Sequence, residues 1–209
     1  MISVQTAFIE LPLVAILRGL EPDRALEVGG ALLQQGFRLV EVPLNSPDPL
    51  ASIRILAEAF GGRMVIGGGT VLGTADVGRI ADVGGRLVVM PHGDPAVIRA
   101  ARREGLTCIP GVATPTEAFR ALDEGAEALK LFPAEALPPD VVRAWRAVLP
   151  ETTRLLPVGG ITPETVEPYV QAGASGFGVG SSLFKPGLPL PKIRDNALAL
   201  AAAYRRALA

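Results

Sequence analysis

Short apolar runs alternate with longer amphipathic segments along the whole chain, and the runs recur about every 20 to 27 residues. Short apolar runs that are bounded by turn residues are typical of buried strands. The pattern predicts eight strands, at Leu13–Leu17, Leu39–Val42, Met64–Ile66, Leu87–Met90, Thr107–Ile109, Ala128–Phe132, Leu155–Val158 and Gly176–Val179.

The amphipathic segments between these runs carry signals for the start of a helix. Asp94-Pro95, Thr114-Pro115-Thr116-Glu117 and Thr162-Pro163-Glu164 each place a capping side chain before a proline at the first helical position. We therefore expect a helix after each strand. We also expect a short leading helix or arm over Met1–Glu10 and a final Ala-rich helix over Leu188–Ala209.

Eight strand–helix units in series imply parallel strands joined by helical crossovers. Eight is also the number that closes a (β/α)8 TIM barrel, and we predict one α/β barrel domain over residues 1–209, which is small for that fold. No linker, low-complexity segment or charge block marks a second domain. An open, doubly wound parallel sheet is the alternative.

The numbers of basic and acidic residues bear on which kinds of partner the protein binds. The chain has 20 basic and 21 acidic residues, which gives no reason to expect nucleic acid or a membrane surface. Residues 1–10 lack the basic start and apolar run of a signal peptide, and no segment has the roughly 20 apolar residues that span a bilayer. We therefore expect a cytoplasmic protein. Cys108 is the only cysteine and His92 the only histidine, which argues against an internal disulfide and a cysteine- or histidine-rich metal site.

Lys130 stands inside an apolar run, in a chain with only three lysines. Strand alternation places Ala128, Lys130 and Phe132 on one face. Desolvation lowers the pKa of a buried lysine and leaves the neutral amine available as a nucleophile. Such a lysine can form a Schiff base with a ketone and so prepare a carbon–carbon bond for cleavage. A structural lysine paired with a carboxylate is the alternative.

Two further charged residues lie within or directly after a predicted strand. Glu41 is the single charge within its apolar run, and burial would raise its pKa toward the range of a group that donates and accepts protons near neutrality. A structural ion pair with Lys130 or Arg18 is the alternative for Glu41. Arg18 follows the first strand and is suited to a two-pronged hydrogen bond with a carboxylate, although alone it is typical of a surface arginine.

Glycine-rich turns follow three of the predicted strands. Thr70 comes after three glycines, so a ligand could approach the backbone closely and meet its hydroxyl; an ordinary tight turn is the alternative. Gly159-Gly160 and Gly180-Ser181 follow strands seven and eight, where barrels frequently bind phosphate through backbone N–H groups and a helix N-terminus. No cluster with metal-ligand spacing appears, so we expect this site to work without a metal.

Taken together, these motifs resemble the class I aldolases that cleave 2-dehydro-3-deoxy-6-phospho sugar acids to pyruvate and glyceraldehyde 3-phosphate. The resemblance runs from about Pro12 to Gly187 and implies a (β/α)8 barrel, usually a homotrimer, with no metal or organic cofactor. The motifs that carry it are Val14-Ala15-Ile16-Leu17-Arg18-Gly19, Val40-Glu41-Val42, Gly67-Gly68-Gly69-Thr70-Val71-Leu72, Ile109-Pro110-Gly111, Leu129-Lys130-Leu131-Phe132-Pro133 and Val158-Gly159-Gly160-Ile161.

The resemblance also implies a role for each candidate residue. Lys130 would form the Schiff base, Glu41 would move protons, and Arg18 and Thr70 would bind substrate around its carboxylate. The residues implied to hold the phosphate are Gly159, Gly160, Gly180 and Ser181. We expect further substrate contacts from Asn45, Pro91 and Phe132.

Two branches of this family differ in the stereochemistry of the substrate at C4. The stretch Glu41-Val42-Pro43-Leu44-Asn45-Ser46-Pro47 is similar to the branch for the galactonate-derived substrate, whereas the gluconate branch typically has Thr at position 43 and Arg at position 45. One alternative is an aldolase for the gluconate-derived epimer, alone or together with 4-hydroxy-2-oxoglutarate. The others are an isomerase on a phosphate-binding barrel and a non-catalytic sugar-phosphate sensor. His92 departs from both branches, so its role stays open.

Overall fold

In the computed structural model, which describes residues 1–208, every pair of neighbouring strands runs parallel. Six strands form one sheet in the order β5-β4-β3-β2-β1-β9, and three form a second in the order β6-β7-β8. The strands are β1 (Leu13–Ile16), β2 (Leu39–Pro43), β3 (Val65–Gly69), β4 (Leu87–Val89), β5 (Thr107–Ile109), β6 (Gly111–Val112), β7 (Leu129–Leu131), β8 (Leu155–Pro157) and β9 (Phe177–Val179).

Each of the eight predicted runs overlaps a strand, and the fifth run coincides with β5. The short strand β6, which follows Pro110, was not predicted; Pro110 separates it from β5 because proline has no N–H to donate. The two sheets adjoin at both ends. A parallel bridge joins Val158 after β8 to Gly178 in β9. At the other junction, the N–H of Glu127 donates to the carbonyl of Cys108 at 3.3 Å. The prediction of parallel strands is therefore confirmed.

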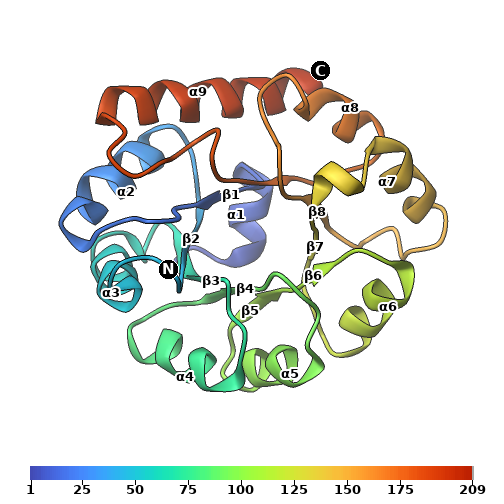
Figure 1. Ribbon diagram of the computed structural model, residues 1–209, viewed down its shortest axis with the longest axis horizontal. Coiled ribbons are helices and arrows are strands. Elements are labelled where there is room, and N and C mark those ends of the chain that lie inside the picture. The colour runs from blue at the N-terminus through green and yellow to red at the C-terminus, as the bar shows by residue number, and fades with distance from the viewer. Residues whose placement is uncertain (209) are drawn as a thin grey trace.

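Helices surround the strands, as Figure 1 shows for α2 to α9. Two of the three predicted helix starts are confirmed: Thr114 forms a capping box with Glu117, and Asp94 accepts a hydrogen bond from the N–H of Ala96. The described helices are α1 (Val4–Glu10), η1 (Pro22–Arg24), α2 (Ala25–Gln34), α3 (Pro49–Phe60), α4 (Thr74–Asp82), α5 (Pro95–Arg103), α6 (Pro115–Asp123), η2 (Ala134–Ala136), α7 (Pro139–Arg146), α8 (Val166–Gln171) and α9 (Leu190–Ala207).

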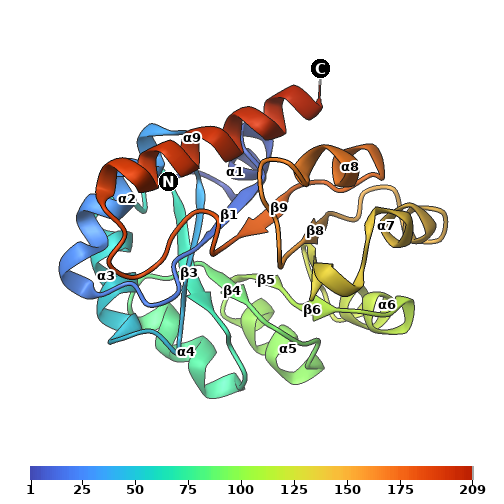
Figure 2. The ribbon, with the colours of Figure 1, turned by 45° about the horizontal axis from the view of Figure 1, so that its top comes forward.

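One predicted helix start is wrong. The segment from Thr162 is a turn in which the N–H of Thr165 donates to the carbonyl of Thr162, and α8 begins only at Val166. The predicted final helix is present as α9, which packs against α2 and α8 (Figure 2); position 209 lies outside the described residues. Between residues 1 and 208, no helix combines the length and apolar character needed to cross a membrane.

Strand alternation sorts the apolar side chains into two clusters. Val40 and Val42 of β2 and Leu129 and Leu131 of β7 pack outward against the surrounding helices. The residues of opposite parity form an inner cluster with α1: Ala7, Phe8, Val14, Leu39, Val65, Leu87, Val89, Ile109, Ala128 and Leu156. Glu41 and Lys130 therefore belong to the inward-facing set.

Helix α1 lies against the N-terminal ends of the strands. Arg86, directly before β4, donates to the carbonyl of Ile2 at 2.8 Å, and Arg38, directly before β2, donates to Glu10 at 2.6 Å. Arg154, directly before β8, stacks over the ring of Phe8 at 4.9 Å. Because α1 covers the N-terminal ends of the strands, a ligand can enter only from the side of their carboxyl ends.

Candidate active site

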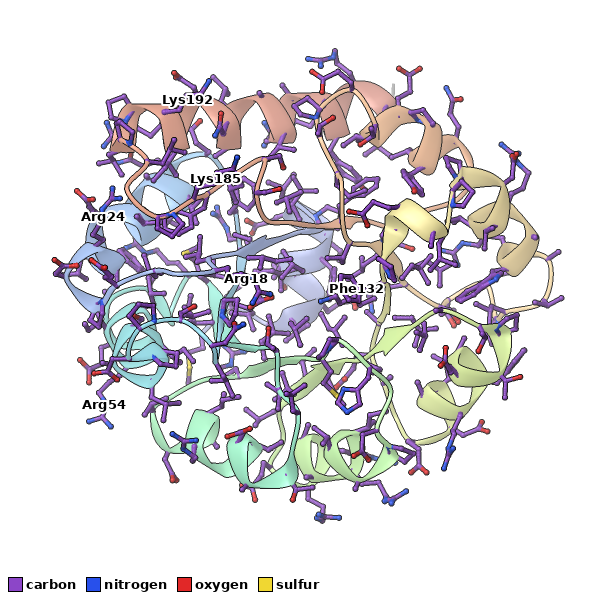
Figure 3. All side chains as sticks on the ribbon, in the orientation of Figure 1. Arg18, Arg24, Arg54, Phe132, Lys185 and Lys192 are labelled. Atoms are coloured by element: carbon purple, nitrogen blue, oxygen red, sulfur yellow. The ribbon has the colours of Figure 1, made fainter. Side chains whose placement is uncertain are left out.

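A cavity of about 530 Å³ opens at the carboxyl ends of the strands. Arg18 follows β1 and Phe132 follows β7, and both line the cavity; Figure 3 labels them. All but one of the predicted site residues line it, the exception being Glu41. Those that do are Arg18, Asn45, Thr70, Pro91, Lys130, Phe132, Gly159, Gly160, Gly180 and Ser181.

Lys130 supplies the amine at the floor of this cavity. Its side chain comes from the middle of β7 and is only 7% exposed. Burial lowers the pKa of this amine, the nearby Glu41 carboxylate raises it, and Arg18 lowers it again. The Nζ atom lies 4.6 Å from the ring centroid of Phe132, so the aromatic face covers one side of the amine. The lysine is thus partly desolvated yet open to a ligand in the cavity.

Glu41 lies behind this floor, on β2. It is 1% exposed, and its Oε2 atom has no hydrogen-bond partner among the described residues. Burial raises the pKa of Glu41 to about 7, against the opposing effect of Lys130 and then of Arg18. A carboxyl group with this pKa is present in both protonation states near neutrality, which is the requirement for moving protons in both directions.

Gly69 makes room for the Glu41 carboxyl group. A Cβ built on Gly69 would overlap both carboxyl oxygens of Glu41. No unusual backbone angle explains this glycine, because its φ lies outside the left-handed region. The side chain that would normally stand on the inner face of β3 is therefore absent where the carboxyl group from β2 is seated.

Arg18 forms the rim of the cavity with two other predicted residues. Its guanidinium donates to Asn45 Oδ1 at 2.6 Å and to Thr70 Oγ1 at 3.3 Å. Thr70 has a φ of +54°, which is strained for a β-branched residue and is typical of functional sites. Asp48, not Asn45, caps α3 by accepting from the N–H of Ala51. Asn45 therefore belongs to the rim, and it orients the arginine.

The two late turns form the opposite wall. Gly159 and Gly160 have φ values of +112° and +63°, which glycine adopts without strain. Gly180 and Ser181 follow β9 in the same wall. The exposed carboxylate of Glu135 lies against the first turn, since a Cβ on Gly159 would overlap it. This wall thus offers backbone N–H groups and a hydroxyl next to an acidic side chain.

Sequence reasoning missed several lining residues. Lys185 and Pro186 come from the loop after β9, and Ile16, Val158 and Phe184 add apolar surface. Lys185 could have been found, because it is one of three lysines and follows the end of the eighth predicted strand. His92 does not line the cavity; its backbone carbonyl accepts from the N–H of Gly111 at 3.2 Å.

The comparisons with known proteins agree with this geometry. A family model described as KDPG and KHG aldolase matches residues 4–192. This chain belongs to the KDPG and KHG aldolase family. The aldolase chain is 50% identical over 195 residues to the probable 2-dehydro-3-deoxy-6-phosphogalactonate aldolase of Rhizobium meliloti (strain 1021), covering 93% of this chain and 92% of the relative.

Two further matches point the same way. The 2-dehydro-3-deoxy-6-phosphogalactonate aldolase of Escherichia coli (strain K12) is 45% identical over 199 residues, which are 95% of this aldolase and 97% of the relative. A solved structure called native KDPGal aligns with a TM-score of 0.94 and 45% identity, over 95% of this chain and 97% of that one. Three curated relatives named 2-dehydro-3-deoxy-phosphogluconate aldolase are 28–30% identical.

Proposed function

We propose that this chain is a Schiff-base aldolase that cleaves 2-dehydro-3-deoxy-6-phosphogalactonate to pyruvate and D-glyceraldehyde 3-phosphate, as in galactonate degradation by an Entner–Doudoroff type of route. The observation that carries the reaction type is Lys130, a desolvated amine at the floor of a ligand-sized cavity with the Glu41 carboxyl group behind it. The names of the relatives at 45–50% identity support the galactonate-derived substrate.

The proposed reaction begins when the neutral amine of Lys130 attacks the C2 ketone. Glu41 donates a proton as the carbinolamine loses water, and an iminium forms on Lys130. The Glu41 carboxylate then accepts the proton of the C4 hydroxyl while the C3–C4 bond breaks. The electron pair of the C3–C4 bond moves into the iminium and gives an enamine. Glyceraldehyde 3-phosphate leaves, the enamine is protonated at C3, and water releases pyruvate and Lys130.

The walls of the cavity would hold the two charged ends of the substrate. Arg18 carries a permanent positive charge and can bind the carboxylate, with Thr70 beside it. The turns at Gly159-Gly160 and Gly180-Ser181 face the cavity with N–H groups suited to the phosphate. Asn45, Pro91 and Phe132 would contact the sugar chain between these ends.

We infer further that the two sheets close into one (β/α)8 barrel and that the chain is a single domain. The bridge between Val158 and Gly178, the hydrogen bond from Glu127 to Cys108 and the inner apolar cluster support this closure. The family resemblance supports a homotrimer that works in the cytoplasm. Light scattering of the purified protein would measure the number of subunits.

The experiment for the proposed function is a pyruvate-forming assay coupled to lactate dehydrogenase, with both C4 epimers as substrates. We expect turnover of both and a higher kcat/KM for the galactonate-derived epimer. A preference for the gluconate-derived epimer would overturn the substrate assignment and leave the aldolase reaction standing. Ligand binding without pyruvate formation would overturn the reaction itself and favour a sugar-phosphate sensor.

A further inference from the structure

The phosphate end of the cavity needs a positive charge that the turns do not supply. A phosphate monoester carries a charge of about −1.5 to −2 at pH 7. Gly159, Gly160 and Ser181 offer only neutral donors, and the Glu135 carboxylate lies against the same turn. Neutral donors alone would leave the phosphate close to a like charge.

Three cationic side chains line the cavity, and two of them have other tasks in the proposed reaction. Lys130 must be neutral to attack the ketone. Arg18 is held at the rim by Asn45 and Thr70, where the substrate carboxylate would bind. Lys185 is the third. It follows β9 and the Gly180-Ser181 turn, and it forms no ion pair with any residue from 1 to 208.

The loop that carries Lys185 is anchored on both sides. Asn196 in α9 donates to the carbonyl of Leu183 at 3.2 Å, and Arg24 donates to the carbonyl of Leu188 at 3.0 Å. Pro186 packs so closely on Gly19 that a Cβ there would meet its ring. The backbone on either side of Lys185 is therefore fixed relative to the rim and to the helix behind it.

We propose that Lys185 binds the substrate phosphate and selects phosphorylated sugar acids over their non-phosphorylated counterparts. This inference rests on the proposed function, since it names the cation for the phosphate end of the same substrate. The ammonium group acts as a point charge beside the N–H groups of the two turns and offsets the repulsion from Glu135.

The test compares Lys185→Met with Lys192→Met, which removes an exposed lysine on α9 away from the cavity (Figure 3). For Lys185→Met we expect kcat/KM for the phosphorylated substrate to fall about 10- to 100-fold, the size expected for a lost hydrogen bond to a charged group. The value for 2-dehydro-3-deoxygalactonate should not change. Lys192→Met should match wild type on both substrates, and Lys185→Arg should retain most of the preference.

Calorimetric titration of the resting protein with inorganic phosphate gives a second measurement that needs no turnover. We expect weaker binding by Lys185→Met and unchanged binding by Lys192→Met. Equal losses on the phosphorylated and non-phosphorylated substrates, or unchanged phosphate binding by Lys185→Met, would overturn the role of Lys185. Failure of the wild type to release pyruvate would instead overturn the proposed function, and the titration would still decide the role of Lys185.

Discussion

Burial shifts the pKa values of Glu41 and Lys130 in opposite directions, upward for the acid and downward for the amine. Both shifts disfavour the charged form, and each group lowers the shift of the other through its charge. Glu41 is protonated below its pKa of about 7 and ionised above it. As the pH falls through 7, the resting protein therefore loses the carboxylate that can accept a proton from the Lys130 ammonium group, and Lys130 must lose that proton before it attacks the ketone.

We accordingly expect kcat/KM to rise as the pH increases through about 7. Glu41→Gln should remove this limb of the profile and lower kcat by about 10²- to 10⁴-fold. The second ionisation of the substrate phosphate, near pH 6, remains in both proteins, so the difference between their profiles isolates Glu41. Identical pH profiles would show that Glu41 moves no proton in the reaction.

Gly69 provides a second prediction at the scale of one residue. Gly69→Ala should displace the Glu41 carboxyl group and lower kcat by about 100-fold, the effect expected of a shift of about 1 Å at a catalytic group. Gly68→Ala is the matched control, because a Cβ there meets the side chain of Ile80 on the outer face. The shorter acid of Glu41→Asp should restore part of the activity of Gly69→Ala. Equal losses in the two glycine variants would contradict this positioning role.

At the scale of the elements, periodicity predicted most of the fold, because buried parallel strands must be short and apolar and must alternate with amphipathic helices. Alternation also predicted that Lys130 shares a face with Ala128, and the inner cluster shows that this face is the inward one. The short strand β6 was missed because Pro110, which has no N–H, directly follows the fifth predicted run and separates β6 from β5. The late start of α8 was hidden because Thr162 and Pro163 favour a turn as well as a helix start.

The rest of the site depends on contacts that no local pattern encodes. Arg18 meets Asn45 and Thr70, which lie 27 and 52 positions away in the sequence. The space beside Gly69 that the Glu41 carboxyl group occupies likewise requires β2 and β3 to pair in their observed register. Such contacts exist only after the strands have assembled, so the sequence could suggest the residues but not their partners.

The loop after β2 provides a prediction about substrate preference. Asn45→Arg with Pro43→Thr would replace the neutral acceptor of Arg18 by a second cation and add an N–H to the end of the strand. A hydroxyl that changes direction between C4 epimers should respond to this exchange, since a mismatched site leaves polar groups unpaired. We expect the preference to shift toward the gluconate-derived epimer. An unchanged ratio of the two kcat/KM values would remove this loop from the determinants of specificity.

At the scale of the whole molecule, the two ends of the strands have different tasks. Helix α1 and the arginines before β2, β4 and β8 close one end. Residues that follow β1, β2, β3, β4, β7, β8 and β9 surround the cavity at the other. The floor of that cavity brings Lys130 into range of Glu41 and Arg18. Catalysis by this arrangement requires a covalent bond between Lys130 and the ketone carbon of the substrate.

The most direct test is reduction with borohydride in the presence of pyruvate, followed by peptide mass spectrometry. We predict inactivation, with a reduced pyruvate adduct on the peptide that contains Lys130. Lys130→Met should form no adduct and should release no pyruvate from the sugar acid, while Lys185→Met and Lys192→Met should still be labelled at Lys130. An adduct on Lys185 or Lys192, with Lys130→Met fully active, would contradict Schiff-base formation on Lys130.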